Sequence, residues 1–438
     1  MGGRGRRGLH WSLIGIALFI LLAIATPFLV PISGFIPELE RIASEKLGQP
    51  VSIDELRLHP LPTPRMVANG IAVGRKMDLT IGELEIVPDV TSFVSGARSI
   101  RLIQAERVYV RESALAIPKG MPKSQGGEPI FVRRLVLKEV NLQHSKLRVP
   151  QFDADVALGE GFSLERALLE TRDGSMKLEL DASKAFTFTA KQWILPAGAP
   201  LKFDALAVQG TLKGEQLDLT KIEGLLYGGK IAGTARASWT KQWQVTGNAK
   251  LAGVDLVPVQ QAFGKPAKLS GRLKADAAFS SRAKAANQLG NALMLDGPFE
   301  VEGGAYQGVD LSKAGDITGK PAAGDATSFE ELRGLLQMRG KQVKINRLCV
   351  RSPKVVAGGN VEIAPDQKLS GKLDISVAKT GGFVGVPVSL GGTTSDPSVT
   401  PTRGYVIGAV IGTVLLPGIG TSIGSSIGSR IEGTSDCK

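Results

Sequence analysis

The chain has 438 residues, a net charge of +12 from 53 basic and 41 acidic side chains, and an aromatic content of only 5%. That length suits two or three domains, and the scarcity of aromatic residues disfavours a compact enzyme with a large core. The 54 glycines, beside many Val, Leu and Ile, favour strands joined by tight turns. Two cysteines exclude a disulfide-rich scaffold. The basic balance suits either a soluble surface or contact with anionic lipid.

The first 32 residues have the pattern of a membrane anchor. Residues 1–8 form a basic tail, and residues 9–32 are apolar, without Asp, Glu, Lys or Arg. A helix of that length, rising about 1.5 Å per residue, spans a hydrocarbon core of about 30 Å. Because the arginines precede it, we expect the tail in the cytoplasm and the remaining chain to be exported. A cleaved signal peptide, ending at the A-I-A sequence of 23–25, is the alternative, but the apolar run continues past that site.

A short helix followed by strands is predicted for the region 33–116. Pro37 suits a first helical turn, and Gly48 is a natural stop. The apolar residues that share one face of this helix are Leu39, Ile42, Ala43 and Leu47. Beyond it, segments such as VSIDELRL and IRLIQAERVYV alternate apolar and charged residues. This alternation predicts strands with one buried face and one wet face, which is typical of antiparallel sheets.

A linker is predicted at 117–129, where IPKGMPKSQGGEP contains three prolines and three glycines. Strands continue from 130 to 402 with two helical exceptions, which we expect at 281–295 and 327–337. In the second of these, Ser328 and Glu331 have the spacing of a capping box.

Three short words recur within the strand-rich region. They begin at Gly253 and Gly308 for GVDL, at Gly264 and Gly319 for GKPA, and at Lys268 and Lys368 for KLSG. The first two words share a separation of 55 residues. Repeated use of a strand unit predicts an elongated sheet rather than one globule.

No pattern in the sequence indicates catalysis, a cofactor or a metal. The spacing around His144 does not support a Ser-His-Asp triad, which is recognised by geometry and roles. The G-x-G-x-x-G match at 3–8 follows no strand, so we do not interpret it as a dinucleotide site. His, Cys and Asp form no cluster with metal-ligand spacing. Scattered basic residues with few aromatics provide no stacking platform, so we expect no nucleic-acid partner.

The region 403–430 carries two glycine ladders and no charge between its terminal arginines. The ladder residues are Gly404, Gly408, Gly412, Gly420, Gly424 and Gly428. Glycines four residues apart share one helix face and allow two helices to pack closely, with Pro417-Gly418 as the turn. Each leg would be about 20 Å long, shorter than a bilayer core of about 30 Å. We therefore predict a helical hairpin that enters a membrane shallowly or covers an apolar end of the sheet, followed by a tail at 431–438. A single kinked span and a flexible tail are the alternatives.

Segments at both ends of the strand-rich region resemble the AsmA family. FIPELERIASEKLGQPVSIDELRLHP is similar to the family's N-terminal region. FEVEGGAYQGVDLSKA, GKQVKINRLCVRSPKVVAGGNVEIAPDQKLSGKLDI and VPVSLGGTTSDPSVTP are similar to its C-terminal region. The resemblance covers residues 10–402 in order, although the middle third is similar only in general character. The glycine-ladder region is not a hallmark of the family.

The resemblance implies a single-pass protein of the bacterial inner membrane whose bulk lies in the periplasm. It implies an elongated, curved, antiparallel β-sheet with an apolar groove for phospholipids, and no catalytic residue. The implied partners are the inner membrane, phospholipids, and the outer membrane or one of its proteins, with roles in outer-membrane biogenesis and lipid homeostasis. The alternative function is a non-catalytic assembly factor for outer-membrane proteins that binds through sheet edges.

Alternation from 131 to 380 supplies candidate lipid-facing positions. These are Leu135, Leu137, Leu269 and Leu273. A filled sandwich core would produce the same alternation, so the pattern alone leaves groove and core open. In an exported chain, Cys349 and Cys437 are a possible disulfide, and two free thiols are the alternative.

Overall fold

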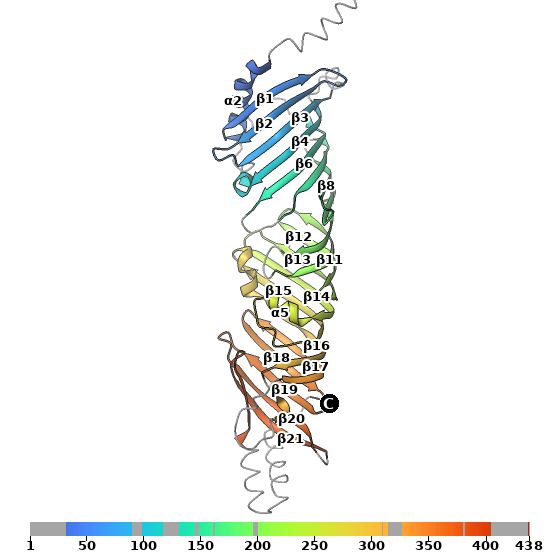
Figure 1. Cartoon of the computed structure of the whole chain (residues 1–438), viewed down its shortest axis with the longest axis vertical. Helices are drawn as coiled ribbons and strands as arrows, with labels where there is room; N and C mark the ends of the chain where they lie inside the picture. The colour runs from blue at the N-terminus through green and yellow to red at the C-terminus, as the bar shows by residue number, and fades with distance from the viewer. Residues whose placement is uncertain are drawn as a thin grey trace, which may run out of the picture. The chain divides into compact units, whose positions relative to one another are not determined.

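The computed structural model describes residues 32–89, 99–116, 131–144, 149–160, 163–195, 200–308, 310–313, 326–379, 382–403 and 437. Hydrogen bonding assigns the 22 strands of these residues to one sheet, which confirms the mainly β fold (Figure 1). The chain divides into two compact units, residues 1–187 (unit 1) and 188–438 (unit 2).

Several predicted segments lie outside the described residues. They are the basic tail, the anchor at 9–32 apart from its last residue, the linker at 117–129, and the glycine ladders from Gly404 to Gly428. Within the described part of the chain, every helix is too short or too polar to cross a membrane.

The elements of unit 1 are η1 (Ile32–Phe35), α2 (Ile36–Leu47), β1 (Val51–His59), β2 (Arg65–Val73), β3 (Leu79–Pro88), β4 (Ser99–Arg111), η2 (Glu112–Ala116), β5 (Phe131–Val132), β6 (Arg134–Gln143), β7 (Phe152–Leu158), β8 (Leu164–Thr171) and β9 (Met176–Asp181). Strand β10 (Ala185–Ile194) begins in unit 1 and ends in unit 2.

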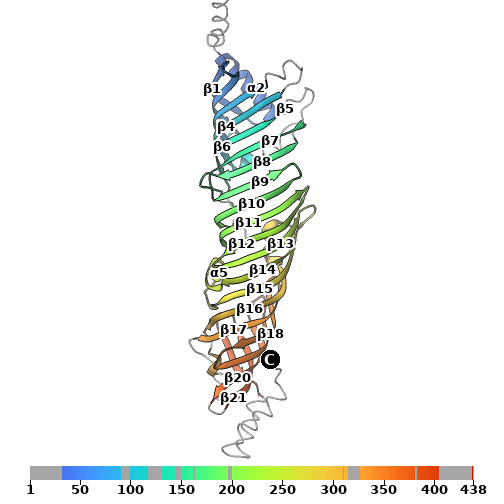
Figure 2. The ribbon, with the colours of Figure 1, turned by 90° about the vertical axis from the view of Figure 1, so that its right-hand side faces the viewer.

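The elements of unit 2 are β11 (Lys202–Lys213), β12 (Gln216–Leu226), β13 (Gly229–Ser238), β14 (Trp243–Asp255), α5 (Leu256–Ala262), β15 (Arg272–Ala283), η4 (Ala286–Ala292), β16 (Met294–Gln307), η5 (Leu311–Lys313), β17 (Ala326–Arg339), β18 (Gln342–Arg351), β19 (Val355–Ile363), β20 (Leu369–Lys379), β21 (Gly382–Gly392) and β22 (Pro397–Pro401). From β11 to β22 each strand pairs antiparallel with the next, as Figure 2 shows for β11–β18.

Helix α2 confirms the short helix predicted after the apolar stretch. Gly48 ends it in the left-handed region, at φ 64°. Ile36, Leu39 and Leu47 pack against the buried apolar residues of β1 and β2, and Figure 1 shows α2 beside these strands. Ile42 is 41% exposed, so it lies off the packed face on which it was expected.

The same helix covers the outer edge of β1. Glu40 Oε1 accepts a hydrogen bond from the Ile53 N–H at 2.7 Å, and Ser44 Oγ accepts one from the Val51 N–H at 2.9 Å. These two backbone N–H groups are therefore not free to pair with another chain.

Strand β4 of unit 1 has parallel rather than antiparallel neighbours in β5 and β6. Strands β4 and β6 run in the same direction, with Ala105 opposite Leu137. Parallel neighbours need a crossover connection, whereas antiparallel neighbours need only a tight turn. The proline- and glycine-rich stretch predicted as a linker lies in that connection. Alternation of apolar residues is the same in both kinds of pair, so the sequence did not reveal this exception.

Two predicted helices of unit 2 differ from the structure. The helix expected at 327–337 is wrong, because these residues form β17, which pairs with β16 on one side and β18 on the other. Pairing on both edges outweighs the local capping-box signal of Ser328 and Glu331. The helix expected at 281–295 is shorter, because β15 continues to Ala283 and only η4 is helical.

The repeated GVDL word has a structural basis. Each copy ends a strand, with glycine at φ 71° for Gly253 and 94° for Gly308. Asp255 then accepts a hydrogen bond from the Val257 N–H at 3.0 Å and begins α5, while Asp310 accepts one at 3.0 Å and begins η5. Each word thus specifies a strand end, a capping carboxylate and a helical turn.

The C-terminal strands of unit 2 enclose a filled core. Ile375 and Val388 are 0% exposed, and Val386 is 1% exposed, within a cluster drawn mainly from β16–β22. Beyond this core, β22 pairs only with β21 among the described strands. Its terminal residues, Pro397 and Pro401, lack the N–H that edge pairing needs.

Candidate functional site

Strands β11–β17 align apolar and small side chains on one face of unit 2, which we call the inner face. Strand register places three rows on it. The rows are Val208, Ile222, Gly233, Ala249 and Ala277; Leu206, Gly224, Ile231, Leu251, Ala275, Phe299 and Gly334; and Leu219, Ala235, Gly247, Phe279, Leu295 and Met338. No charged residue belongs to these rows.

The inner-face residues are half-buried, not buried, except for Leu206 and Ala277. Ile231, for example, keeps part of its surface in solvent, whereas Ile375 in the filled core keeps none. A second layer of side chains packed on these rows would bury them as it buries Ile375. The inner face therefore remains in part open to solvent.

Glycine on the inner face lets neighbouring backbones approach closely on that side. A Cβ atom placed on Gly297 would lie 2.1 Å from the carbonyl oxygen of Asp276. A Cβ on Gly233 would lie 2.3 Å from the carbonyl oxygen of Asn248. Only glycine fits such contacts, and their occurrence on the same face bends the strands toward it. The inner face is thus a concave apolar surface.

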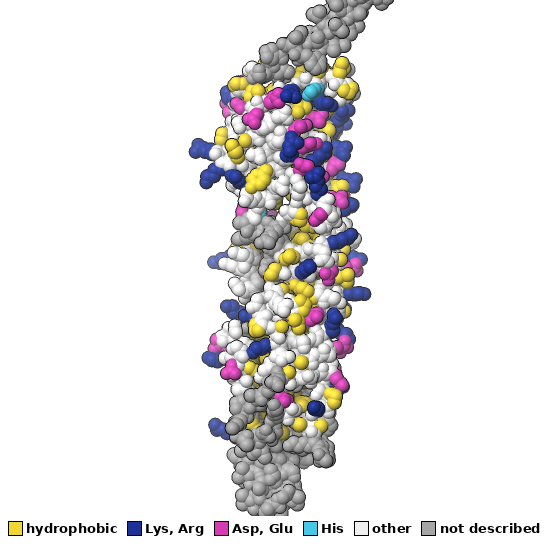
Figure 3. Space-filling model, viewed as in Figure 1, with side chains coloured by type: hydrophobic (Ala, Val, Ile, Leu, Met, Phe, Trp, Pro, Cys, Tyr) yellow, Lys and Arg dark blue, Asp and Glu magenta, His cyan; other side chains and the backbone are white. Residues whose placement is uncertain are grey.

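Two short helical segments flank the inner face at opposite ends of β15. At one end, α5 contributes Leu256 to the packing around the filled core. At the other end, η4 is held over the inner face because Ser281 Oγ donates a hydrogen bond to the Leu289 carbonyl oxygen at 2.6 Å. In Figure 3, hydrophobic side chains gather over the middle of unit 2 and Lys and Arg side chains stand along its margins.

Two tryptophans lie at the same end of the strands as η4. Trp239 and Trp243 flank the β13–β14 turn, and their rings stack with centroids 5.3 Å apart. Trp243 lies opposite Ala283 and belongs to the inner face by strand alternation. Both side chains are half-buried, so the inner face ends here in an aromatic border.

The opposite face of the same strands, the outer face, carries paired charges. Lys250 and Asp276 lie 3.1 Å apart, and Lys274 pairs with Glu302 across β15 and β16. The hydrogen bond to Glu302 raises the pKa of Lys274, and the same bond lowers the pKa of Glu302. Exposed pairs of this kind contribute little stability, and they mark a solvated face.

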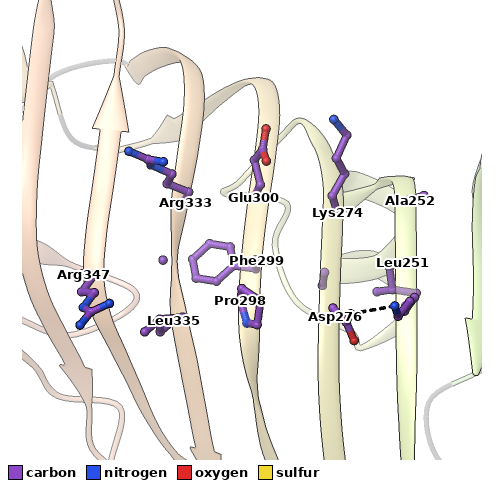
Figure 4. A pocket seen from close by; sticks show the side chains of 13 residues that line it. Leu251, Ala252, Lys274, Asp276, Pro298, Phe299, Glu300, Arg333, Leu335 and Arg347 are labelled. Carbon is purple, nitrogen blue, oxygen red and sulfur yellow. Dashed lines mark ion pairs between the residues drawn. The ribbon is translucent and has the colours of Figure 1, made fainter. Parts of the chain in front are cut away.

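A shallow depression of about 700 Å³ lies on the outer face. Two rows of side chains border it in Figure 4, and Phe299 and Leu251 of the inner-face rows lie between them. One row holds Lys274, Glu300 and Arg333, and the other holds Asp276, Pro298 and Leu335. Positive and negative side chains alternate along the first row, and Lys274 and Arg333 form ion pairs with Glu302 and Glu331. The depression therefore has the character of a hydrated surface.

In the described ranges, no group of three or more His, Cys, Asp or Glu side chains is placed to hold a metal ion. A smaller depression of about 400 Å³ in unit 1 is bordered by charged residues such as Lys138, Asp153 and Glu170, as on the outer face of unit 2.

The candidate lipid-facing residues occupy two different settings. Leu135 and Leu137 lie in β6 opposite Val156 and Ala154, on the apolar face of unit 1, and are half-buried. Leu269 and Leu273 pack against the filled core of unit 2 and are also half-buried. The latter pair thus lies where the inner face meets the filled core.

Sequence reasoning did not single out the rows of β11–β16. Their signal was present in GKIAGTARAS and WQVTGNAKLAG, where small apolar residues and glycine alternate with polar ones. Small residues produce a weak hydrophobic signal, and eight of the eighteen residues in the three rows are glycine or alanine.

The two cysteines form a disulfide in the structure. Cys349 in β18 is 1% exposed and is joined to Cys437, with their Cα atoms 5.1 Å apart. The bond closes a loop across 88 residues. The bond therefore fixes Cys437 against strand β18.

Comparison with models of protein families, with curated proteins and with solved structures finds no match to this chain.

Proposed function

We propose that the inner face of unit 2 shields the acyl chains of phospholipids, in a protein anchored in the bacterial inner membrane with its bulk in the periplasm. One observation supports this most directly: three uncharged rows on a concave face stay half-buried, while the outer face of the same strands carries paired ions. A face that only stabilised the fold would be covered by a second layer.

The size of the surface suits an acyl chain. Neighbouring strands lie about 4.8 Å apart, so the row from Leu206 to Phe299 extends about 24 Å across six strands. One leaflet of a bilayer contributes about 15 Å of a hydrocarbon core of about 30 Å. Each CH₂ group removed from water stabilises the bound state by about 0.8 kcal/mol, so contact along part of the row is sufficient for binding.

The same proposal includes a role in moving phospholipid between membranes. In this role, the apolar stretch at 9–32 holds the chain in the inner membrane, and an elongated, curved sheet carries or conducts phospholipid toward the outer membrane. The glycine-ladder hairpin at 403–430 would contact a membrane or an apolar end of the sheet. The AsmA resemblance and the apolar alternation of the strands support this role, which would serve outer-membrane biogenesis and lipid homeostasis.

A charge on the inner face tests the proposal. Ala249→Asp places a carboxylate among the apolar rows, whereas Asn248→Asp places the same carboxylate on the outer face of the same strand. We expect phospholipid that co-purifies with the full chain, quantified by mass spectrometry of an organic extract, to fall at least fivefold in Ala249→Asp. Asn248→Asp should retain it, and both variants should be expressed equally. Equal lipid content in the two variants would contradict the proposal.

Photocrosslinking at the positions expected from sequence extends the test to both units. A photoreactive residue at Leu135 or Leu137 should capture lipid if the apolar face of unit 1 also participates. Leu269 and Leu273, which pack on the filled core, should capture less than the open rows.

The second candidate function is an assembly factor that binds outer-membrane proteins through sheet edges. Parts of both described edges are closed to such pairing. Side chains of α2 occupy N–H groups of β1, and prolines begin and end β22. We therefore rank this function below lipid shielding.

A further inference from the structure

One rim of the inner face carries a lysine at each of four successive hairpins, and we call it the lysine rim. Because the strands form an antiparallel meander, the connections β11–β12, β13–β14, β15–β16 and β17–β18 lie at the same end of the strands. Their lysines are Lys213, Lys241, Lys284 and Lys341. All four are exposed, and none forms an ion pair with a residue in the described ranges. Glu215 is the only acidic residue in these four connections.

The aromatic border lies on this same rim. Lys241 occupies the turn between the stacked Trp239 and Trp243. Lys284 follows Ala283, which lies opposite Trp243 in the strand register. Two unpaired ammonium groups thus flank an indole pair at the end of an apolar surface. Tryptophan favours the level of lipid headgroups because its ring is apolar and its N–H is polar.

The opposite rim is built differently. Lys268 there donates hydrogen bonds to the carbonyl oxygens of Thr394 and Ser395, at 3.2 and 2.6 Å. Arg272 donates to the carbonyl oxygen of Gly253 at 3.2 Å. Helix α5 and its capping Asp255 also lie on that side. Part of its positive charge is therefore engaged in holding the fold together.

We propose that the lysine rim binds the anionic headgroup of a phospholipid whose acyl chains lie on the inner face, so that the protein prefers anionic over zwitterionic phospholipids. This inference rests on the proposed function and adds to it the class of lipid and the location of the headgroup. The contact is electrostatic and exposed, so the preference weakens as salt rises.

The test uses the full chain in nonionic detergent with two probes that share one photoactivatable acyl chain, a phosphatidylglycerol and a phosphatidylcholine. Labelling of the protein by each probe is measured for the native chain and for Lys241→Gln/Lys284→Gln. The matched control is Lys230→Gln/Lys265→Gln, which removes two exposed lysines from the opposite rim. All these side chains are exposed, and Trp fluorescence verifies that the variants are folded.

We expect the native chain to label with phosphatidylglycerol about thirtyfold more strongly than with phosphatidylcholine, on the basis of two lysines that each contribute about 1 kcal/mol beside an anionic group. The lysine-rim variant should lose this preference while its phosphatidylcholine labelling stays unchanged, and the control should keep it. Equal labelling of the native chain by both probes, or an equal loss in variant and control, would overturn the headgroup assignment and leave lipid shielding intact. No labelling by either probe would overturn both.

Discussion

Truncating one isoleucine in the filled core and one on the inner face should have very different effects on stability. Ile375 is 0% exposed and lies between Ala357 and Val386 in the sheet. Ile231 is half-buried and lies between Gly224 and Leu251. Ile375→Ala and Ile231→Ala remove the same atoms from strands of the same unit. The difference between their effects on the free energy of unfolding therefore reports how well each side chain is covered.

The magnitudes follow from burial. Removal of three carbon groups from a fully buried site costs about 2.4 kcal/mol in transfer free energy, at about 0.8 kcal/mol per group. The cavity that remains raises the cost for Ile375→Ala to about 4 kcal/mol. At Ile231 water already reaches part of the side chain and no closed cavity forms. We therefore expect Ile231→Ala to lower the free energy of unfolding by only about 1 kcal/mol.

Urea unfolding of delipidated protein measures both costs. The fluorescence of Trp193, Trp239 and Trp243 reports on unit 2, which contains all three. A difference of about 3 kcal/mol between the two variants is the expected result. Equal losses of about 4 kcal/mol would mean that Ile231 belongs to a filled core, and the concave-face interpretation would then be wrong.

Three further predictions address other parts of the structure. Alkylation of unfolded, non-reduced protein should label neither cysteine, and labelling of both would refute the disulfide. Gly297→Val should destabilise unit 2 by more than about 2 kcal/mol in urea, because its Cβ would overlap a carbonyl oxygen. Gly290→Val, with no atom within 4 Å of its Cβ, should cost less than half as much. The hydrogen bond from Lys138 lowers the pKa of Glu106, so its contribution is present above about pH 4.5 and is lost on acidification below it. Between pH 4.5 and 3, the free energy of unfolding of unit 1 should therefore fall less steeply in Lys138→Met than in the native chain. The difference between the two should stay below about 1 kcal/mol because the pair is part-exposed.

Elements specified by local chemistry could be predicted from the sequence. The first turn at Pro37 and the stop at Gly48 are such signals, and α2 follows them. Alternation in unit 2 also assigns faces correctly, with Ala249 inward and Lys250 outward. These features depend on residues near one another in the chain.

Features that depend on distant partners could not be predicted in this way. Ser328 and Glu331 satisfy a helix signal, but β16 and β18 hold their segment as a strand. The parallel pairing of β4 and β6 changes no local pattern. Helix α5 was missed although Asp255 caps it and Pro258 falls in its first turn, because the segment is only seven residues long.

The candidate site shows the same limit. Alternating apolar residues form a filled core in β19–β21 and a half-buried face in β11–β16. Nothing in the alternation distinguishes them, because the difference is whether another layer covers the face. Glycines such as Gly233 and Gly297 indicate the concave region only once the neighbouring strands are known.

A photocrosslinker scan along β14 tests the central claim most directly. The photoreactive residue is introduced in turn at Val245, Ala249 and Leu251 on the inner face, and at two outer-face positions, Asn248 and Lys250. Cells are irradiated, and lipid adducts on the purified protein are identified by mass spectrometry. We expect phospholipid adducts at the three inner positions and none at the two outer ones, since successive strand residues point to opposite faces. Adducts of equal yield at all five positions, or adducts only at the outer ones, would contradict the account.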